Sequence, residues 1–366
     1  MDPRVRGLAR VIVRYSLELR EGQTFLISSG VVAEPLIQAI YEETLEVGAH
    51  PVLDLSLEGT QSAFFGRASD AQLDWVSPTQ MWGFDEADAR IRILSDTNTR
   101  ELSNVPPERQ TRRQKTMHPH MTRMMERSAS GDLRWNVTLF PTNAYASEAS
   151  MSLRDYEDFY YRACLCDQDD PVAAWQQAAQ ETNRLADWIE GREEVRIEGP
   201  GTDLTLNVAG RHFKPADGKY NMPDGEFFTG PVEDSAEGEI TFHLPATYSG
   251  REVAGVRFRF EGGKVVDASA ERGEDFLIEV LDTDEGARRL GELGIGTNFG
   301  IVDGTGEILL DEKIGGTVHL AVGQSYPETG GVNESAVHWD MICDLRQGGS
   351  ITVDGEVLQR DGKFVV

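Results

Sequence analysis

The chain has 366 residues, of which 39% are hydrophobic, so it is long enough for two domains with packed cores. Its net charge of −27 argues against nucleic acid or an anionic membrane as the main partner, because phosphate binding needs clustered lysine and arginine. It has neither an apolar run of about 18 residues that could span a membrane nor the apolar segment of a signal peptide, so we expect a cytoplasmic protein.

The first half of the chain alternates helical and strand patterns. The predicted helices are 4–20, 34–47, 60–76, 107–127, 152–163 and 171–190, and the predicted strands are 24–28, 51–55, 89–94 and 135–140. Strands that alternate with helices are typical of βαβ units. We therefore expect an α/β domain with a mainly parallel sheet over residues 1–192.

The pattern changes near Gly191, after which short strands between glycine, aspartate and proline dominate. The predicted strands are 194–198, 203–208, 238–244, 255–260, 264–269, 317–322, 335–342 and 350–353. Only 275–290 has a clear helical pattern, in which Asp282 and Glu285 fit a capping box. Residues 193–366 are therefore expected to form a β-rich α+β domain.

Two motifs in the first half carry little functional information. A single glycine, Gly30, follows the first predicted strand, whereas the dinucleotide fingerprint needs three glycines at this turn. His118 and His120 flank Pro119, which we expect to start or break a helix, and no carboxylate cluster lies beside them. A surface or helix-start role is favoured for this histidine pair over metal binding.

The second half places histidine and carboxylate side chains on apolar strands. His338 and Asp340 are two residues apart, so they share one face of a strand, while Val337, Trp339 and Met341 share the other. This pair suits a divalent metal and equally suits a hydrogen-bonded histidine–aspartate couple.

A second strand and three glutamates extend this set. His319 lies on the apolar strand 317–322, where a lone histidine is commonly a core residue. Glu226 opens an apolar strand, Glu292 lies in the apolar run 290–295, and Glu312 closes the run 308–312. A buried carboxylate needs a partner, so a set of two histidines and four carboxylates in one domain indicates a metal site.

With this set, the chain resembles the aminopeptidase T and aminopeptidase S family of thermophilic-type metallo-aminopeptidases. The segments that carry the resemblance are 221–226, 290–292, 316–323 with Tyr326, and 338–340. The resemblance implies a homodimer and a binuclear centre in the C-terminal domain that binds two divalent ions, Zn, Co or Mn. The implied metal ligands are Glu226, Glu292, Glu312, His319, His338 and Asp340.

The implied activity is removal of the N-terminal amino acid from peptides with a free N-terminus by a metal-activated water. Glu292 and Tyr326 are the candidate catalytic residues. The sequence leaves open which glutamate accepts the proton of the water, and Tyr326 would either donate a hydrogen bond to the oxyanion or pack against Pro327. The alternatives are another binuclear metallohydrolase, such as a dipeptidase, amidase or amino-acid esterase, and a non-catalytic metal-binding dimer.

Overall fold

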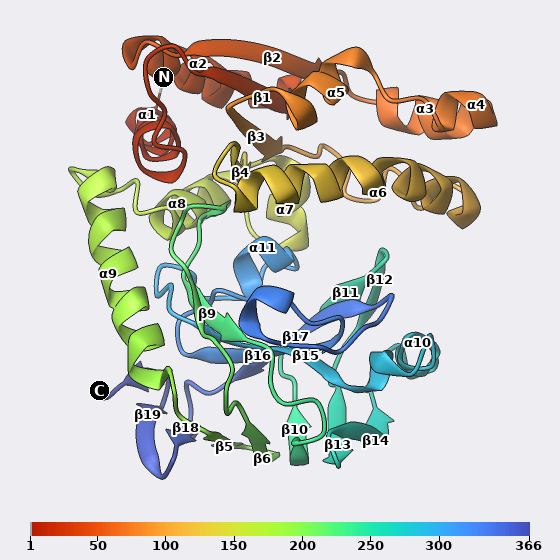
Figure 1. The fold of residues 1–366 in the computed structure, drawn as a ribbon, viewed down its shortest axis with the longest axis vertical. Helices are drawn as coiled ribbons and strands as arrows, with labels where there is room; N and C mark the ends of the chain where they lie inside the picture. Colours follow the sequence, from red (N-terminus) through yellow and green to blue (C-terminus); the bar gives the residue numbers. More distant parts are fainter. Residues whose placement is uncertain (1) are drawn as a thin grey trace. The chain divides into compact units, whose positions relative to one another are not determined.

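The computed structural model describes residues 2–366, and these residues form two compact units (Figure 1). Unit 1 comprises the residues up to Gln176 together with Gly218–Pro223, and unit 2 comprises Gln177–Asp217 together with Asp224–Val366. The helix α9 (Pro171–Ile189) begins in unit 1 and ends in unit 2. The expected domain boundary after residue 192 lies just beyond the end of α9. That residues 1–192 and 193–366 are separate domains stays a prediction.

Unit 1 has the predicted α/β architecture. Its strands are β1 (Thr24–Gly30), β2 (His50–Ser56), β3 (Ala89–Leu94), β4 (Arg134–Leu139) and β8 (Asn221–Met222). Its helical segments are α1 (Pro3–Arg10), η1 (Val11–Ser16), η2 (Val31–Ala33), α2 (Glu34–Glu46), α3 (Thr60–Arg67), α4 (Asp70–Leu73), α5 (Pro78–Asp85), α6 (Pro107–Ala129), α7 (Asn143–Glu148) and α8 (Leu153–Ala163). All pairings in the sheet β2-β1-β3-β4-β8 are parallel, which confirms the prediction.

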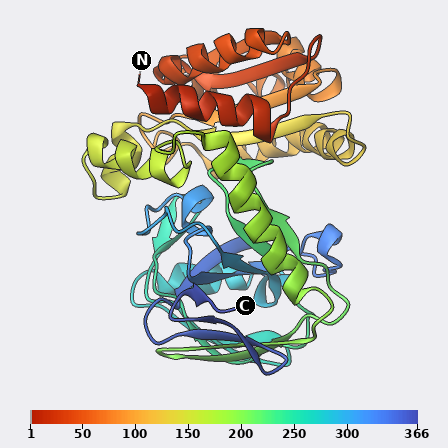
Figure 2. The ribbon, with the colours of Figure 1, turned by 90° about the vertical axis from the view of Figure 1, so that its left-hand side faces the viewer.

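Helices cover both faces of this sheet (Figure 2). On one face, Gly83 of α5 packs so closely on Leu26 of β1 that a Cβ atom would lie 2.3 Å from the leucine side chain. On the other face, the Tyr160 hydroxyl of α8 lies 2.9 Å from the Thr138 hydroxyl of β4. Because β1 lies between β2 and β3, the strand order reverses at β1, and this reversal defines the topological switch point of the sheet.

Two predictions for the helices of unit 1 were wrong in detail. Pro119 lies inside α6, which continues without a break on both sides of it, so the proline neither starts nor ends a helix. The proline removes one backbone donor, and the remaining turns of this 23-residue helix keep their hydrogen bonds. The predicted helix 60–76 is divided into α3 and α4, because Ser69 forms a capping box with Gln72 and starts a new helix.

Unit 2 contains an eight-stranded sheet, a five-stranded sheet and a hairpin. The eight-stranded sheet comprises β14 (Lys264–Ser269), β13 (Arg257–Glu261), β10 (Glu237–Thr241), β6 (Thr202–Asn207), β5 (Glu194–Gly199), β18 (Ser350–Val353), β19 (Glu356–Arg360) and β20 (Lys363–Phe364). The five-stranded sheet comprises β17 (His338–Asp344), β16 (Thr317–Gly323), β15 (Leu290–Gly296), β9 (Glu226–Thr229) and β7 (Lys214–Ala216). The hairpin is β11 (Ala246–Tyr248) with β12 (Arg251–Val253), and the short helices are α10 (Glu274–Leu281), η3 (Gly286–Arg288), α11 (Ile308–Asp311) and η4 (Pro327–Thr329).

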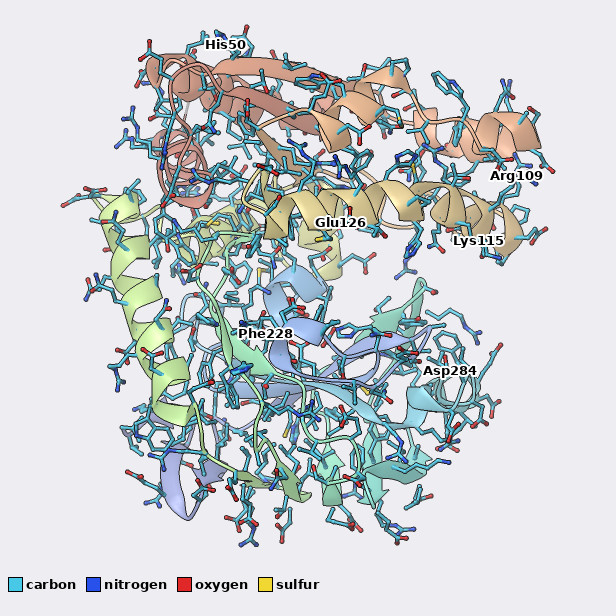
Figure 3. All side chains as sticks on the ribbon, in the orientation of Figure 1. His50, Arg109, Lys115, Glu126, Phe228 and Asp284 are labelled. Atoms are coloured by element: carbon cyan, nitrogen blue, oxygen red, sulfur yellow. The ribbon has the colours of Figure 1, made fainter. Side chains whose placement is uncertain are left out.

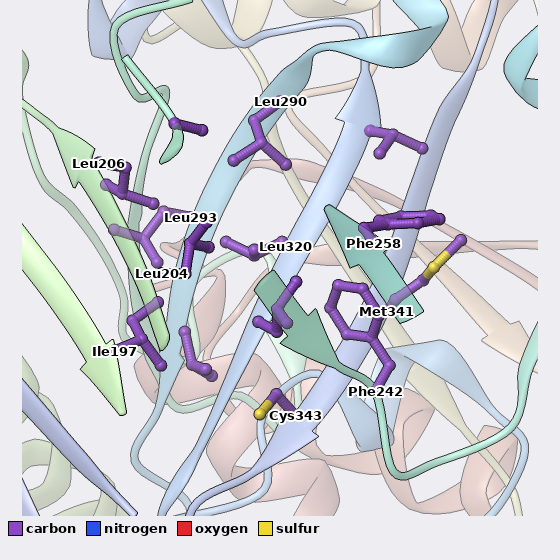
Figure 4. Close-up of a cluster of buried hydrophobic side chains, with 14 of the residues drawn as sticks. Ile197, Leu204, Leu206, Phe242, Phe258, Leu290, Leu293, Leu320, Met341 and Cys343 are labelled. Atoms are coloured by element: carbon purple, nitrogen blue, oxygen red, sulfur yellow. The ribbon is translucent and has the colours of Figure 1, made fainter. Parts of the chain in front are cut away.

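The two large sheets of unit 2 share one hydrophobic core (Figure 4). Leu293 of β15, Leu320 of β16 and Met341 of β17 lie on the inner face of the five-stranded sheet and are at most 1% exposed. Leu204 of β6 and Phe258 of β13 belong to the eight-stranded sheet and to the same core. Burial of these apolar side chains fixes which face of the five-stranded sheet points away from the core.

The prediction of a helix over 275–290 was wrong at its C-terminal end. The helix α10 ends at Leu281, Asp282 is its C-cap rather than part of an N-terminal capping box, and Leu290 already belongs to β15. The glycine-rich run of β15 has weak strand propensity, and pairing with β9 and β16 on its two sides decides its structure. The β-rich α+β prediction for this part of the chain is confirmed.

None of the helices formed by residues 2–366 is both long and apolar enough to cross a bilayer.

Candidate metal centre

The outer face of the five-stranded sheet in unit 2 carries a cluster of carboxylates and imidazoles. Glu226 of β9 pairs with Gly296, His319 of β16 pairs with Gly294, and Asp340 of β17 pairs with Ala321. Side chains alternate between the faces of a strand, so the apolar neighbours of these residues enter the core while the polar residues share the other face. The alternation predicted for His338 and Asp340 from the sequence is present.

A β-bulge in β15 puts Glu292 on the polar face. Leu290 pairs with Val322, and Glu292 pairs with Ala321, so Gly291 is the extra residue between them. In a regular strand Leu290 and Glu292 would share a face. The bulge lets Leu290 enter the core while Glu292 joins the cluster. A Cβ atom at Gly291 would lie 2.3 Å from the Gln324 carbonyl oxygen, so this position accepts only glycine.

A second glycine of β15 makes room for an imidazole. A Cβ atom at Gly294 would lie 2.0 Å from His319 Nε2, which means that the ring of His319 lies directly over the Gly294 backbone. The absence of a side chain at this position allows His319 to reach Glu226 and Glu292.

The polar side chains form two groups that share Glu292. Glu226 Oε2 lies 3.2 Å from His319 Nε2, and Glu292 Oε1 lies 3.6 Å from the same atom. The other oxygen of Glu292, Oε2, lies 3.3 Å from His338 Nε2. Asp340 Oδ2 lies 3.5 Å from the same nitrogen of His338. Within each group, potential ligand atoms lie within 4.8 Å of one another. The Glu292 carboxylate therefore points one oxygen at each histidine.

The protonation of the cluster follows from burial and mutual charge. Burial raises the pKa of Glu226 to about 8, and the charges of Glu312 and Glu292 act in the same direction. Burial opposes ionisation of Glu292 as well, but hydrogen bonds from His319 and His338 lower its pKa to about 2. Burial would lower the pKa values of the two histidines, yet the surrounding carboxylates raise them to about 10 for His319 and about 11 for His338. In this arrangement, cations stabilise the carboxylates.

Lys313 supplies a third cation, which sequence reasoning did not identify. Its side chain is fully buried, and Nζ lies 3.2 Å from Glu226 Oε1 and 3.8 Å from Asp224 Oδ1. It also donates a hydrogen bond to Glu312. The nearby carboxylate of Asp311, the last residue of α11, accepts hydrogen bonds from the Thr305 and Gly306 amides, which ties the segment before α11 to the end of this helix. A single lysine in a loop has no periodic signal, so only the folded structure shows its position.

Glu312 and Tyr326 lie at the edge of the two groups. Glu312 belongs to neither group: its carboxylate contacts Lys313, and it lies near enough to Asp340 and His319 for their charges to act on it. The Tyr326 hydroxyl lies 3.5 Å from His338 Nε2, and its ring packs edge-on against Phe228 (labelled on β9 in Figure 3). Burial and the nearby carboxylates raise the pKa of Tyr326, so its hydroxyl keeps its proton.

The two histidines are held differently at their second ring nitrogen. His338 Nδ1 lies 2.9 Å from the Gln324 carbonyl oxygen and donates to it, which directs Nε2 toward the carboxylates. The segment before His338 is tied down by Asp284 (labelled in Figure 3), which accepts hydrogen bonds from the Ser335 hydroxyl and the Ala336 amide. His319 Nδ1, by contrast, is buried and has no hydrogen-bond partner among residues 2–366.

The residues of the cluster fit divalent cations. The donors are carboxylate oxygens and imidazole nitrogens without cysteine, a set that suits Zn, Co or Mn. In the described part of the chain, the buried Oδ1 of Asp340 accepts no hydrogen bond, and leaving a buried carboxylate oxygen in this state costs free energy. A cation beside Asp340 would remove this cost.

Comparison with known proteins supports the interpretation of this cluster as a metal site. Residues 1–364 match the thermophilic metalloprotease family M29. Aminopeptidase T of Thermus aquaticus is 30% identical to the chain, over 98% of the chain and 95% of the relative. Aminopeptidase AmpS of Bacillus subtilis is 24% identical, over 97% of each. The solved structure of wild-type AmpT from Thermus thermophilus superimposes with a TM-score of 0.85 and 25% identity, over 99% of each chain.

The fold and the histidine–carboxylate cluster define a metalloprotein. The chain belongs to the thermophilic metalloprotease family M29, which confirms the resemblance seen in the sequence and the metallo-aminopeptidase class that it implied.

Proposed function

We propose that the chain removes N-terminal amino acids from peptides at a binuclear metal centre on the outer face of the five-stranded sheet. The observation that carries the proposal is the position of Glu292, whose two oxygens face two separate groups of ligand atoms. Glu226 and His319 would hold one divalent ion, His338 and Asp340 would hold the other, and Glu292 would contact both. Glu312 would complete the ligand set from the edge of the cluster.

Bound divalent ions supply Lewis-acid chemistry, because they lower the pKa of a water molecule and polarise a carbonyl group. The residues of the chain position the substrate and move its protons. We propose that Glu292, whose carboxylate faces both groups of ligand atoms, accepts a proton from the attacking water. Tyr326, whose hydroxyl keeps its proton, is placed to donate a hydrogen bond to the developing oxyanion.

The proposed metal centre supports selection of a free N-terminus. Glu226, Glu312 and Asp340 would be occupied as ligands of the ions, so the neutral α-amine of a substrate would bind at one of the divalent ions. An N-acetylated peptide lacks this amine. A dipeptidase, amidase or amino-acid esterase would use the same residues, and activity on N-acetylated substrates would favour such a hydrolase.

Two further expectations from the sequence belong to this proposal. The chain is proposed to act as a homodimer in the cytoplasm on peptides with free N-termini. Light scattering of the purified protein at low and high salt tests the oligomeric state. A monomer under both conditions would contradict the dimer.

The proposal is tested by hydrolysis of leucine p-nitroanilide before and after chelation, with Co, Zn or Mn added back. We expect activity to be lost on chelation, to return with metal, and to be absent on the N-acetylated substrate. Glu292→Gln should lower kcat at least about 100-fold, the usual contribution of a general base, without changing the fold measured by circular dichroism. Near-wild-type activity of this variant would contradict the assignment.

A further inference from the structure

Unit 1 contains a cavity of about 810 Å³ that is separate from the residues of the metal centre. It lies at the carboxyl ends of three parallel strands, where its lining includes Gly30 at the end of β1, Ser56 at the end of β2 and Ser95 directly after β3. The reversal of strand order at β1 lies at this same edge of the sheet. Open parallel sheets bind small ligands at this kind of position.

Two guanidinium groups of β3 line this cavity. Arg90 and Arg92 are two residues apart and pair with Leu26 and Ser28 of β1, so their side chains share the face that lines the cavity. Arg90 is partly buried, with its guanidinium carbon 4.5 Å from the centre of the Phe84 ring and Nη1 3.3 Å from Met124 Sδ. Within residues 2–366, no oxygen atom accepts a hydrogen bond from either guanidinium.

A third arginine of the lining, Arg113, behaves differently. Arg113 of α6 donates hydrogen bonds to the carbonyl oxygens of Leu73 and Trp75 and to the Gln80 side chain. The guanidinium of Arg113 therefore has hydrogen-bond acceptors within the chain and a structural role. Arg90 and Arg92 have no such role, although Arg90 has lost much of its hydration.

An unpaired guanidinium in this position weakens the fold. Burial lowers the pKa of Arg90 to about 10, the charge of Arg92 acts in the same direction, and only Asp54 opposes them. Transfer of a charge from water without a partner costs free energy, and an apolar side chain of similar length would avoid this cost. Arg92 is exposed, so this cost applies to Arg90 alone; an anion from outside the chain would offset it and would contact both guanidiniums.

The remaining lining limits the kind of anion. Phe64, Trp75 and Met121 offer an apolar surface, which suits an apolar or aromatic group. The lining also includes acidic side chains, which would repel a polyanion such as nucleic acid or a polyphosphate; these are Asp54, Glu58, Asp96 and Glu101. One anionic group beside an apolar group matches this combination.

We propose that the cavity of unit 1 binds a small organic anion, with one carboxylate or phosphate group on Arg90 and Arg92 and an apolar group against the aromatic side chains. This site is independent of the metal centre and of the proposed peptidase activity, because it shares no residue with them. Carboxylate and phosphate have the same recognition chemistry here, and titration with one probe of each kind distinguishes them.

The test is isothermal titration of the full chain with 3-phenylpropionate, phenyl phosphate and the neutral 3-phenylpropionamide. We expect at least one anion to bind saturably and the amide to bind at least about tenfold more weakly, because charge-assisted hydrogen bonds are lost. Arg92→Gln and Arg90→Met should each weaken binding of that anion about tenfold or more. Arg6→Gln, which removes an exposed guanidinium of α1 from the same unit, should leave binding unchanged.

Thermal unfolding of the ligand-free variants separates a binding role from a packing role. Arg90→Met should melt at the wild-type temperature or higher, because it removes an unpaired charge. A clearly lower melting temperature would show that Arg90 is needed for packing, and this result would overturn the inference. Equal binding of the amide, no binding of either anion, or wild-type binding by both arginine variants would also overturn it.

Discussion

Glu292 is the residue on which the two groups of the metal centre depend, because each of its oxygens faces a different histidine. The sequence identified this glutamate through its place in an apolar run and through the resemblance to a known family. The same reasoning identified Glu226, His319, His338 and Asp340, and the structure brings all of them together. Periodicity within a strand shows which residues share a face, so the positions of His319, His338 and Asp340 could be predicted, whereas Glu226 and Glu292 were identified as ligands through the family resemblance.

Lys313 and Gly294 could not be predicted in the same way. Lys313 is significant only because three carboxylates surround its ammonium group, and two of them, Asp224 and Glu226, lie far away in the sequence. Gly294 is significant only because His319 of the neighbouring strand lies over it. Both roles depend on long-range pairing, which a single sequence does not reveal.

Replacement of Lys313 should destabilise the metal-free protein strongly. Lys313→Met leaves the buried carboxylates of Glu226 and Glu312 without their cation, and loss of one partner of a buried ion pair costs about 3–5 kcal/mol. Bound divalent ions would replace part of the lost charge, so the cost should be smaller in the metal-loaded protein. Urea unfolding of both forms measures the difference, and Lys363→Met, at an exposed lysine of β20, is the control. An equal cost in both forms would contradict this account.

Replacement of Gly294 should impair metal binding. The new methyl group in Gly294→Ala would occupy the position of His319 Nε2 and displace the ring. Changes that move a ligand in this way lower metal affinity about 10–100-fold. Competition with a chromogenic chelator measures this affinity. Gly66→Ala is the matched control, since a Cβ atom there meets no atom within 4 Å. Wild-type affinity of Gly294→Ala would show that His319 is not a ligand.

At the scale of elements, the strand β15 shows where secondary structure could not be predicted from the sequence pattern. Its sequence mixes leucine and isoleucine with three glycines, and neither helical nor strand periodicity is clear. The predicted helix therefore ran nine residues past the end of α10 at Leu281. Pairing with β9 and β16 supplies the backbone hydrogen bonds that make this segment a strand, and the bulge at Gly291 then sets the face of Glu292.

The segment between β16 and β17 should position His338 through Asp284. Asp284→Ala removes the acceptor of hydrogen bonds from Ser335, Ala336 and Ala287, and we expect a loss of about 1–3 kcal/mol in stability. Metal affinity should also fall, because the strand that carries His338 loses its anchor. Asp282→Ala, which removes an exposed ion pair with Arg288, should cost less than about 1 kcal/mol. Equal effects of the two substitutions would contradict the role of Asp284.

The contribution of Asp284 should depend on pH. Burial would raise its pKa, but hydrogen bonds from Ala336, Ser335 and Ala287 lower it below the ordinary value. Because the folded-state pKa is the lower one, the carboxylate stabilises the fold above the unfolded value of about 4, and this stabilisation is lost as the pH falls through the folded pKa. The stability difference between the wild type and Asp284→Asn should therefore shrink in acid. A difference that does not change with pH would contradict this account.

At the scale of the whole molecule, the predicted secondary structure changes near Gly191 from alternating helices and strands to short strands. This change predicted the two kinds of architecture that the chain contains. Parallel βαβ units can be read from alternating helix and strand patterns, and this prediction is confirmed in unit 1. The segment Gly218–Pro223 returns to unit 1 and adds β8 to its sheet, and no local pattern indicated this. The sequence therefore predicts the class of each unit better than it predicts which residues belong to each.

The central claim is that Glu292 lies between two metal ions, and anomalous diffraction from crystals grown with Co or Zn tests it most directly. The account predicts two anomalous peaks per chain, about 3.5–4 Å apart, one beside Glu226 and His319 and the other beside His338 and Asp340. One peak, or peaks away from these residues, would contradict a binuclear centre at Glu292.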